Sequence, residues 1–169
     1  MGQFLFPTEY YDSTYSIDFQ KYYDMGYRGL IFDIDNTLVP HNAMHDDRSR
    51  KLFKELREIG FKVCFVSNNK EPRVKKFNDE INCCYVYKAG KPKPDGFIKA
   101  MKKMKTNQGN TLFIGDQIFT DIWGANNARI HSILVNKIDK KEEFQIVLKR
   151  YLEFPIKKLY LLRHKIQTN

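Results

Sequence analysis

The fold is decided by the stretch from residue 29 to residue 39, which reads Gly29-Leu30-Ile31-Phe32-Asp33-Ile34-Asp35-Asn36-Thr37-Leu38-Val39. Its apolar residues form a continuous run, which predicts a strand covered on both faces, as in a parallel sheet. Two aspartates one residue apart, Asp33 and Asp35, follow this run. Ligands of parallel sheets bind outside the carboxyl ends of the strands. Both carboxylates are therefore expected at the ligand-binding edge.

The aspartate pair permits two interpretations. A helix cap or an Asx turn uses one aspartate and is common. Two neighbouring carboxylates repel each other and are costly to desolvate, so a bound metal ion or a shared proton is the other explanation. The segment favours a functional acidic site and leaves the capping turn open.

The rest of the chain repeats the order of strand and then helix. After the first strand, further strands are expected near residues 61–66, 84–87, 111–114 and 131–135. The segments between them have the apolar spacing of helices, and strands that alternate with helices form parallel sheets. We therefore expect an α/β fold of the Rossmann-like type, with three layers and a parallel sheet of about five strands.

Length and composition indicate one domain. The 169 residues fit a single domain over 1–169, with a core at about 29–136, an N-terminal segment 1–28 and a basic helical tail 137–169. The three cysteines form no CxxC motif, which suits a reducing compartment. Neither a signal peptide nor a spanning segment is recognised. A cytoplasmic location is expected, with contact to the inner face of a membrane as an option.

The tail from residue 137 combines apolar and basic residues, and the formal net charge of the chain is +9. A helix is expected around residues 142–152, ending before Phe154-Pro155. Beyond it, Ile156 and Leu159 to Leu162 lie among lysines and arginines. Such a segment either rests on an anionic membrane or packs its leucines on the domain with its lysines in water. The sequence leaves both options open.

Polar residues suited to phosphate chemistry follow the predicted strands. In chain order they are Asp33 and Asp35, Ser67 to Asn69, Lys91, Asp116 and Asp121. Because parallel strands end at one edge of a sheet, these residues are expected to converge. Carboxylates bind Mg²⁺, the metal and a lysine neutralise phosphate oxygens, and one carboxylate can attack phosphorus.

Four short motifs resemble those of the haloacid dehalogenase superfamily of phosphatases and occur in the same order. They are Asp33-x-Asp35-x-Thr37, Ser67, Lys91 and Gly115-Asp116-x-x-x-x-Asp121. Each motif is a weak signal, but four in order at strand ends are specific. The resemblance covers about residues 29–135 and implies a phosphoric monoester hydrolase.

The resemblance also implies catalytic roles. Asp33 would be the nucleophile that forms an aspartyl-phosphate, and Asp35 would act first as general acid and then as general base. Lys91 would offset the negative charge of the nucleophile and the phosphoryl group. The phosphate would be bound by Thr37, Ser67 and Asn68. Taken singly, Ser67 also suits a helix cap and Lys91 also suits a solvated surface.

A Mg²⁺ cofactor is implied by the same resemblance. It would bind the carboxylates of Asp33 and Asp116 and the backbone carbonyl of Asp35. Asp121 would bind it directly or through water, although Asp121 also suits the N-cap of the next helix. As a set, these acids are difficult to explain by capping alone.

The spacing of the motifs leaves no room for a cap domain. One helix fits between Thr37 and Phe61, and one helix with a short strand fits between Asn69 and Lys91. An open site is therefore expected, which favours a large substrate or one presented on a surface.

At a finer level, Asn36 and the string Gln117-x-x-Thr120-Asp121 resemble the capless YqeG-type subgroup, also classed as subfamily IIIA. That subgroup includes phosphatidylglycerophosphate phosphatases of phospholipid synthesis. The resemblance therefore implies that phosphatidylglycerophosphate is the substrate and that the enzyme acts on it at a membrane surface.

Other functions fit less well. No cysteine begins a Cys-x5-Arg motif, and Gly90-Lys91 is followed by Pro92 where a Walker loop has Ser or Thr. Within phosphatases, a soluble sugar phosphate or a nucleic-acid terminal phosphate is the alternative substrate. From another class, a non-catalytic RNA- or ribosome-binding module would explain the basic charge. It would need an aromatic stacking platform, which the sequence lacks, so nucleic acid is not the expected partner.

Overall fold

A parallel sheet forms the centre of the computed structural model, which describes residues 3–139 and 144–167. In this part of the chain the sheet has six strands in the order β1-β6-β5-β2-β3-β4, and every neighbouring pair is parallel. The strands are β1 (Glu9–Tyr11), β2 (Gly29–Phe32), β3 (Lys62–Val66), β4 (Cys84–Val86), β5 (Thr111–Gly115) and β6 (His131–Val135).

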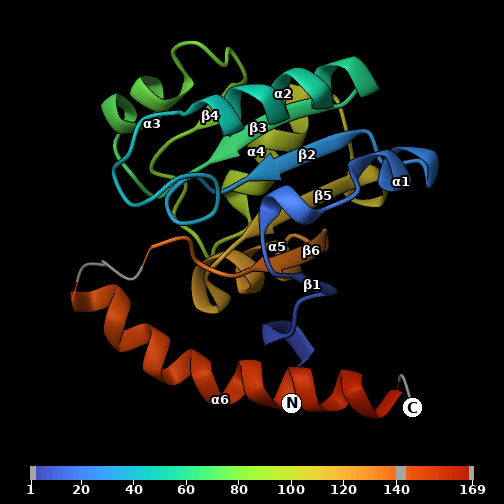
Figure 1. Cartoon of the computed structure of the whole chain (residues 1–169), viewed down its shortest axis with the longest axis vertical. Helices are drawn as coiled ribbons and strands as arrows, with labels where there is room; N and C mark the ends of the chain where they lie inside the picture. The colour runs from blue at the N-terminus through green and yellow to red at the C-terminus, as the bar shows by residue number, and fades with distance from the viewer. Residues whose placement is uncertain (1–2, 140–143, 168–169) are drawn as a thin grey trace.

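Helices cover both faces of the sheet and one further helix lies beyond its β1 edge (Figure 1). The α-helices are α1 (Phe19–Asp24), α2 (Asp47–Ile59), α3 (Glu71–Asn78), α4 (Asp95–Met104), α5 (Trp123–Asn127) and α6 (Phe144–Gln167). Short 3-10 turns are η1 (Gln3–Leu5), η2 (Thr14–Ser16) and η3 (Gln108–Asn110), and η4 (Ile118–Ile122) is a π-helical turn.

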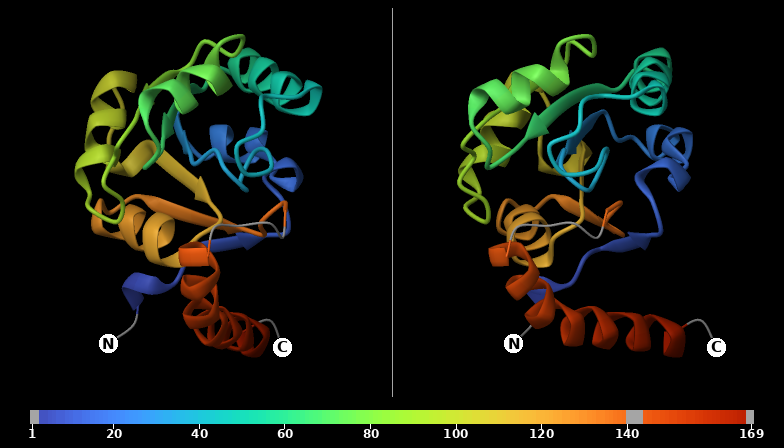
Figure 2. Two further views of the ribbon diagram at one scale, coloured as in Figure 1. Left: turned by 90° about the vertical axis from the view of Figure 1, so that its left-hand side faces the viewer. Right: turned by 60° about the vertical axis from the view of Figure 1, so that its left-hand side comes forward.

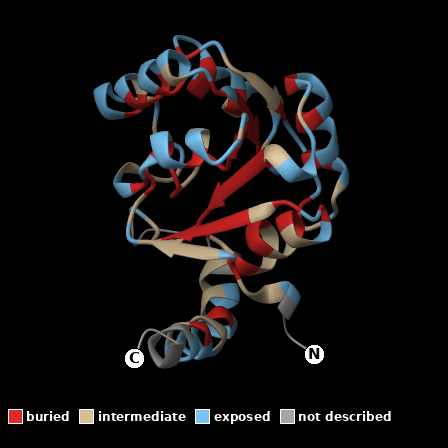
Figure 3. Cartoon of the chain, turned by 90° about the vertical axis from the view of Figure 1, so that its right-hand side faces the viewer, coloured by how far each residue is buried: buried red, intermediate tan, exposed pale blue. Residues whose placement is uncertain are grey.

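The apolar run of β2 separates two hydrophobic cores, because successive side chains of a strand point to opposite faces. Leu30 and Phe32 pack in the core beneath α1, α2 and α3, whereas Ile31 packs in the core beneath α4 and α5. All four residues of β2 are buried, as Figure 3 shows for the central strands. The predicted three-layer α/β fold is confirmed, and its central strand directs Asp33 and Asp35 to the carboxyl edge.

The strand count differs from the prediction of about five. The additional strand is β1, which pairs with β6 through Glu9 and Ile133 at the edge of the sheet. It has three residues, Glu9, Tyr10 and Tyr11, and all are only partly buried. A segment this short, with no alternation or apolar run, lacks the pattern by which a strand is recognised.

The tail helix also differs from the prediction. Helix α6 runs from Phe144 to Gln167 and includes Pro155, whereas the sequence predicts an end before the proline. Pro155 is exposed, so water can bond the backbone carbonyl that the missing donor frees. Figure 2 shows that the helix bends along its course. Within residues 3–139 and 144–167, no helix has the length and apolar character needed to cross a membrane.

Candidate active site

A pocket of about 190 Å³ lies at the carboxyl ends of β2, β3 and β5. Six of the residues predicted from the motifs line it, and so do Ile146 and Lys149 of α6. The six are Asp33, Asp35, Ser67, Asn68, Lys91 and Asp121. The structure therefore brings together six predicted residues that are up to 88 positions apart, the separation of Asp33 and Asp121.

Lys91 joins two of the carboxylates. Its Nζ lies 2.6 Å from Oδ1 of Asp33 and 2.6 Å from Oδ1 of Asp121. All three residues are at most 8% exposed. Charge-assisted hydrogen bonds of this length compensate a buried charge only when each partner is satisfied. Asp121 is further held by the backbone N–H groups of Asp116 and Gln117, at 3.1 Å each.

The electrostatics of this cluster show an excess of buried acid. Burial raises the pKa of Asp33 well above its usual range, and Lys91 only partly offsets this effect. Burial acts to lower the pKa of Lys91, but Asp121 and Asp33 outweigh it, so the net shift is upward and the amine stays protonated. A single lysine thus pairs with two buried carboxylates, an arrangement that further positive charge would stabilise.

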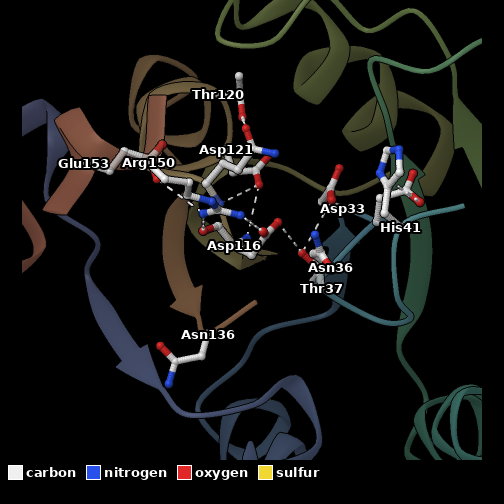
Figure 4. A network of polar contacts seen from close by, with 12 residues as sticks. Asp33, Asn36, Thr37, His41, Asp116, Thr120, Asp121, Asn136, Arg150 and Glu153 are labelled. Carbon is white, nitrogen blue, oxygen red and sulfur yellow. Dashed lines mark hydrogen bonds and ion pairs between the residues drawn. The ribbon is translucent and has the colours of Figure 1, made fainter. Parts of the chain in front are cut away.

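Asp116 follows β5 and is contacted from two distant segments (Figure 4). The Thr37 hydroxyl donates to its Oδ1 at 3.1 Å, and the Arg150 guanidinium of α6 pairs with its Oδ2. Burial raises the pKa of Asp116 to about 6, while Arg150 acts in the opposite direction. The side chain is therefore buried against both a neutral donor and a cation.

The acids of the site have the chemistry of a divalent metal centre. One carboxylate oxygen each from Asp33, Asp116 and Asp121 lies within 4.8 Å of the others, and all three residues are buried. Hard oxygen donors of this kind suit Mg²⁺ and related ions. The set could hold a divalent metal ion, and the raised pKa values of Asp33 and Asp116 are the physical reason that a cation would be favourable there.

The carboxylate of Asp35 lies apart from these three and is held by its own partners. It accepts hydrogen bonds from the backbone N–H of Asn42 at 2.7 Å, from Asn69 Nδ2 at 2.7 Å and from Arg73 Nη2 at 2.8 Å. These contacts place it at the rim of the pocket, facing α3. The two predicted aspartates therefore occupy different environments, although one residue separates them.

The turn after β2 explains that divergence. Asn36 has a left-handed backbone with φ of 64°, which asparagine tolerates better than most residues. Its N–H donates to the Val39 carbonyl at 2.7 Å, which closes the turn. The chain reverses there and directs the buried Thr37 side chain onto Asp116. The helix-cap explanation does not apply here, because neither aspartate is the N-cap of a helix in the described part of the chain; the N-cap of α2 is Asp46.

Ser67 and Asn68 follow β3. Ser67 is 2% exposed, and its hydroxyl accepts a hydrogen bond from the N–H of Asn69 at 3.1 Å. The Asn68 side chain donates to the carbonyl of Lys91 at 3.1 Å and accepts from the N–H of Lys91 at 2.8 Å. Its amide thus holds the lysine loop in position, in addition to lining the pocket.

Sequence reasoning missed the contribution of α6 and α3. Arg150 and Glu153 of α6 reach the loop after β5, where Glu153 accepts from the N–H of Phe119 at 3.0 Å. Arg73 of α3 pairs with Asp35. All three are charged residues on helices, a pattern that also describes solvent-exposed surfaces. Glu153 differs from a surface acid in its burial, because it is 5% exposed. Burial cannot be read from the sequence.

Comparison with known proteins agrees with this site. A family model for haloacid dehalogenase-like hydrolases matches residues 41–129, which include Ser67, Lys91, Asp116 and Asp121. The chain belongs to this family and is a phosphatase. It is 34% identical over 154 residues to the protein named "Probable phosphatase YqeG" of Bacillus subtilis (strain 168), and the match covers 90% of each chain.

Solved structures share the fold. An uncharacterized protein from Listeria monocytogenes serotype 4b is 15% identical, with a TM-score of 0.55 over 69% of this chain and 84% of that one. The cobalt-bound deoxy-D-mannose-octulosonate 8-phosphate phosphatase of Haemophilus influenzae is also 15% identical, with a TM-score of 0.52 over 64% and 68% of the two chains. At these identities the likeness concerns the fold alone.

Proposed function

We propose that the protein is a Mg²⁺-dependent phosphomonoester hydrolase that acts through an aspartyl-phosphate on Asp33 and dephosphorylates phosphatidylglycerophosphate. The observation that carries this proposal is the buried cluster of Asp33, Asp116 and Asp121, in which Lys91 pairs with Asp33 and Asp121 and Arg150 pairs with Asp116. Few structural needs account for three buried acids whose nearest oxygens lie within 4.8 Å of one another, whereas phosphoryl transfer requires acids, a cation and a nucleophile together.

Mg²⁺ would be held by Asp33, Asp116 and Asp121, with the backbone carbonyl of Asp35 as a further ligand. When bound, it would neutralise the oxygens of the transferring phosphoryl group. Lys91 supplies a second positive charge, because its Nζ lies 2.6 Å from Oδ1 of Asp33. Thr37, Ser67 and Asn68 would orient the phosphate, with the backbone N–H groups after β3 and β2.

The reaction has two steps on this chain. A carboxylate oxygen of Asp33 bonds to phosphorus as the ester P–O bond breaks, and Asp35 gives its proton to the departing oxygen. Water then attacks phosphorus, its proton passes to Asp35, and the bond to Asp33 breaks with release of inorganic phosphate. Arg73 and Asn69 keep the Asp35 carboxylate at the rim, where a leaving group would exit.

The lipid substrate is supported by the openness of the site. Residues 37–91 contain α2, β3, α3 and β4 and no further domain, so nothing inserted in the core closes over the pocket. A bulky substrate can therefore approach it. The name of the relative from Bacillus subtilis specifies a probable phosphatase and no substrate, so the lipid substrate is part of the present proposal.

The covalent role is tested with p-nitrophenyl phosphate, with and without EDTA, using Asp33→Asn. We expect loss of activity with EDTA and in the variant, while exposed Asp79→Asn stays active. Circular dichroism confirms folding. Full activity of Asp33→Asn would overturn the covalent step.

The substrate is tested separately by phosphate release. Phosphatidylglycerophosphate in mixed micelles is compared with soluble sugar phosphates and with 5′-phosphorylated oligonucleotides. The lipid is expected to give the highest kcat/KM. A strong preference for either soluble class would overturn the lipid assignment and leave the phosphatase chemistry intact.

A further inference from the structure

Helix α6 presents large apolar side chains to solvent. Six of them are between 46% and 75% exposed: Leu148, Tyr151, Leu152, Phe154, Leu159 and Leu162. Four are leucines at positions 148, 152, 159 and 162, a spacing that keeps them on one side of a helix. We call these four leucines the outer face of α6. It extends over roughly 21 Å, at about 1.5 Å per residue.

The opposite side of α6 is attached to the domain. The leucines of the outer face are therefore exposed although the helix is packed against the protein. Arg150 pairs with Asp116, and Glu153 accepts from Phe119. Tyr160 is 3% exposed and packs against Phe6, with ring centroids 5.9 Å apart. Polar anchors thus face inward while leucines face outward, which reverses the usual arrangement of a surface helix.

The charge of α6 is almost entirely positive. Its sequence holds six lysines and arginines and a single acid, and that acid is the buried Glu153. Lys149, Lys158 and Arg163 are exposed beside the outer face. An apolar stripe flanked by lysine and arginine matches an anionic lipid surface. A second copy of the chain, also +9, would place the same basic residues against each other.

We propose that the outer face of α6 docks on an anionic lipid bilayer, with its apolar side chains in the boundary between headgroups and acyl chains. Ile146 and Lys149 belong both to α6 and to the lining of the pocket, so a docked helix holds the pocket beside the surface. The lipid substrate class rests on the proposed function, but the docking itself requires no catalysis.

Cosedimentation with vesicles tests the docking. Vesicles of phosphatidylcholine alone are compared with vesicles that also contain phosphatidylglycerol, and binding is expected only to the latter. The double variant Leu152→Ser/Leu162→Ser should lower the vesicle affinity roughly tenfold or more. Its control is Met25→Ser/Tyr87→Ser, which removes two exposed apolar side chains elsewhere and should bind normally.

The electrostatic part has its own pair of variants. Lys158→Glu should weaken binding, whereas Lys102→Glu on the exposed side of α4 should not. Asp33→Asn should bind vesicles as the unsubstituted protein does, and the outer-face variant should still hydrolyse p-nitrophenyl phosphate. These two results separate a failure of docking from a failure of the phosphatase proposal.

Three outcomes overturn the docking. The first is absence of binding to the anionic vesicles. The second is equal binding by the outer-face variant and its control. The third is a concentration-dependent dimer in sedimentation velocity that the outer-face variant abolishes, because the face would then belong to a second copy of the chain.

Discussion

At the scale of single residues, Gly115 shows how closely the site is packed. A Cβ at this position would lie 2.6 Å from Oδ2 of Asp121 and 2.7 Å from its Cβ. Asp121 is 1% exposed, and its carboxylate is held by Lys91 and by two backbone N–H groups, so displacing it would strain these contacts. The glycine in the Gly115-Asp116 motif is therefore required by the carboxylate that follows five residues after Asp116.

Gly115→Ala is predicted to displace Asp121 from Lys91 and to lower kcat/KM for p-nitrophenyl phosphate about 100-fold, since small misplacements in a reacting site have effects of that size. Gly109→Ala is the matched control, because its Cβ would only reach 3.4 Å from Oδ1 of Asn107. Equal activities of the two variants would show that the position of Asp121 is unimportant.

Asp116 predicts a pH dependence of stability in the metal-free protein. Its pKa rises from 3.8 to about 6 on folding, mainly because of burial, so the folded state holds more protons in this interval. The free energy of unfolding should therefore fall as pH rises from about 4 to about 6, by roughly 3 kcal/mol from this group.

Urea unfolding with EDTA measures this effect as the difference between the unsubstituted protein and Asp116→Asn. The variant should gain relative stability across that interval, whereas exposed Asp79→Asn should not. A constant difference between pH 4 and pH 6 would contradict the prediction.

At the scale of secondary structure, α6 is joined to the turn η4 by one buried acid. Glu153 accepts from the N–H of Phe119 and pairs with Arg150 at 3.3 Å. Its removal leaves a backbone donor without its acceptor, and a buried unsatisfied group costs about 1–3 kcal/mol.

Glu153→Ala should therefore lower the free energy of unfolding in urea by about that amount. Glu153→Gln is the informative control, because an amide oxygen can still accept from Phe119 although the charge is lost. If both variants were as stable as the unsubstituted protein, the attachment of α6 at this point would contribute nothing.

At the scale of the whole molecule, the net charge of +9 should affect lipid and soluble substrates differently. Raising NaCl from about 0.05 M to about 0.5 M screens a charged surface almost completely. We expect kcat/KM for micellar phosphatidylglycerophosphate to fall several-fold, with a much smaller change for p-nitrophenyl phosphate. Parallel responses would argue against attraction between the basic surface and the lipid.

The sequence predicts the parts of the molecule that depend on local pattern. The apolar run before Asp33 and the order of strands and helices are sufficient to predict the three-layer α/β fold. Motif order is sufficient to bring Asp33, Lys91 and Asp121 to one pocket. The strand β1 could not be predicted, because a three-residue edge strand is defined by its partner β6 and not by its own composition.

The contacts of Arg73 and Arg150 could not be predicted for a related reason. Each lies on a helix whose position depends on tertiary packing, and a helical arginine has the same local sequence pattern when it faces water. The continuation of α6 through Pro155 also depends on context, since the proline is tolerated where water can reach the freed carbonyl.

The pairing of β1 with β6 has a consequence for the order of events during synthesis. Thr8 and Ser132, which are hydrogen bonded at this edge, are 124 positions apart. During synthesis, the segment that becomes β1 leaves the ribosome long before β6, so it has no pairing partner until residues 131–135 have been translated. Contacts of such long sequence separation form slowly. We therefore expect the β1 edge to be the last part of the sheet to close, and nascent chains stalled before His131 to leave Glu9–Tyr11 open to proteases.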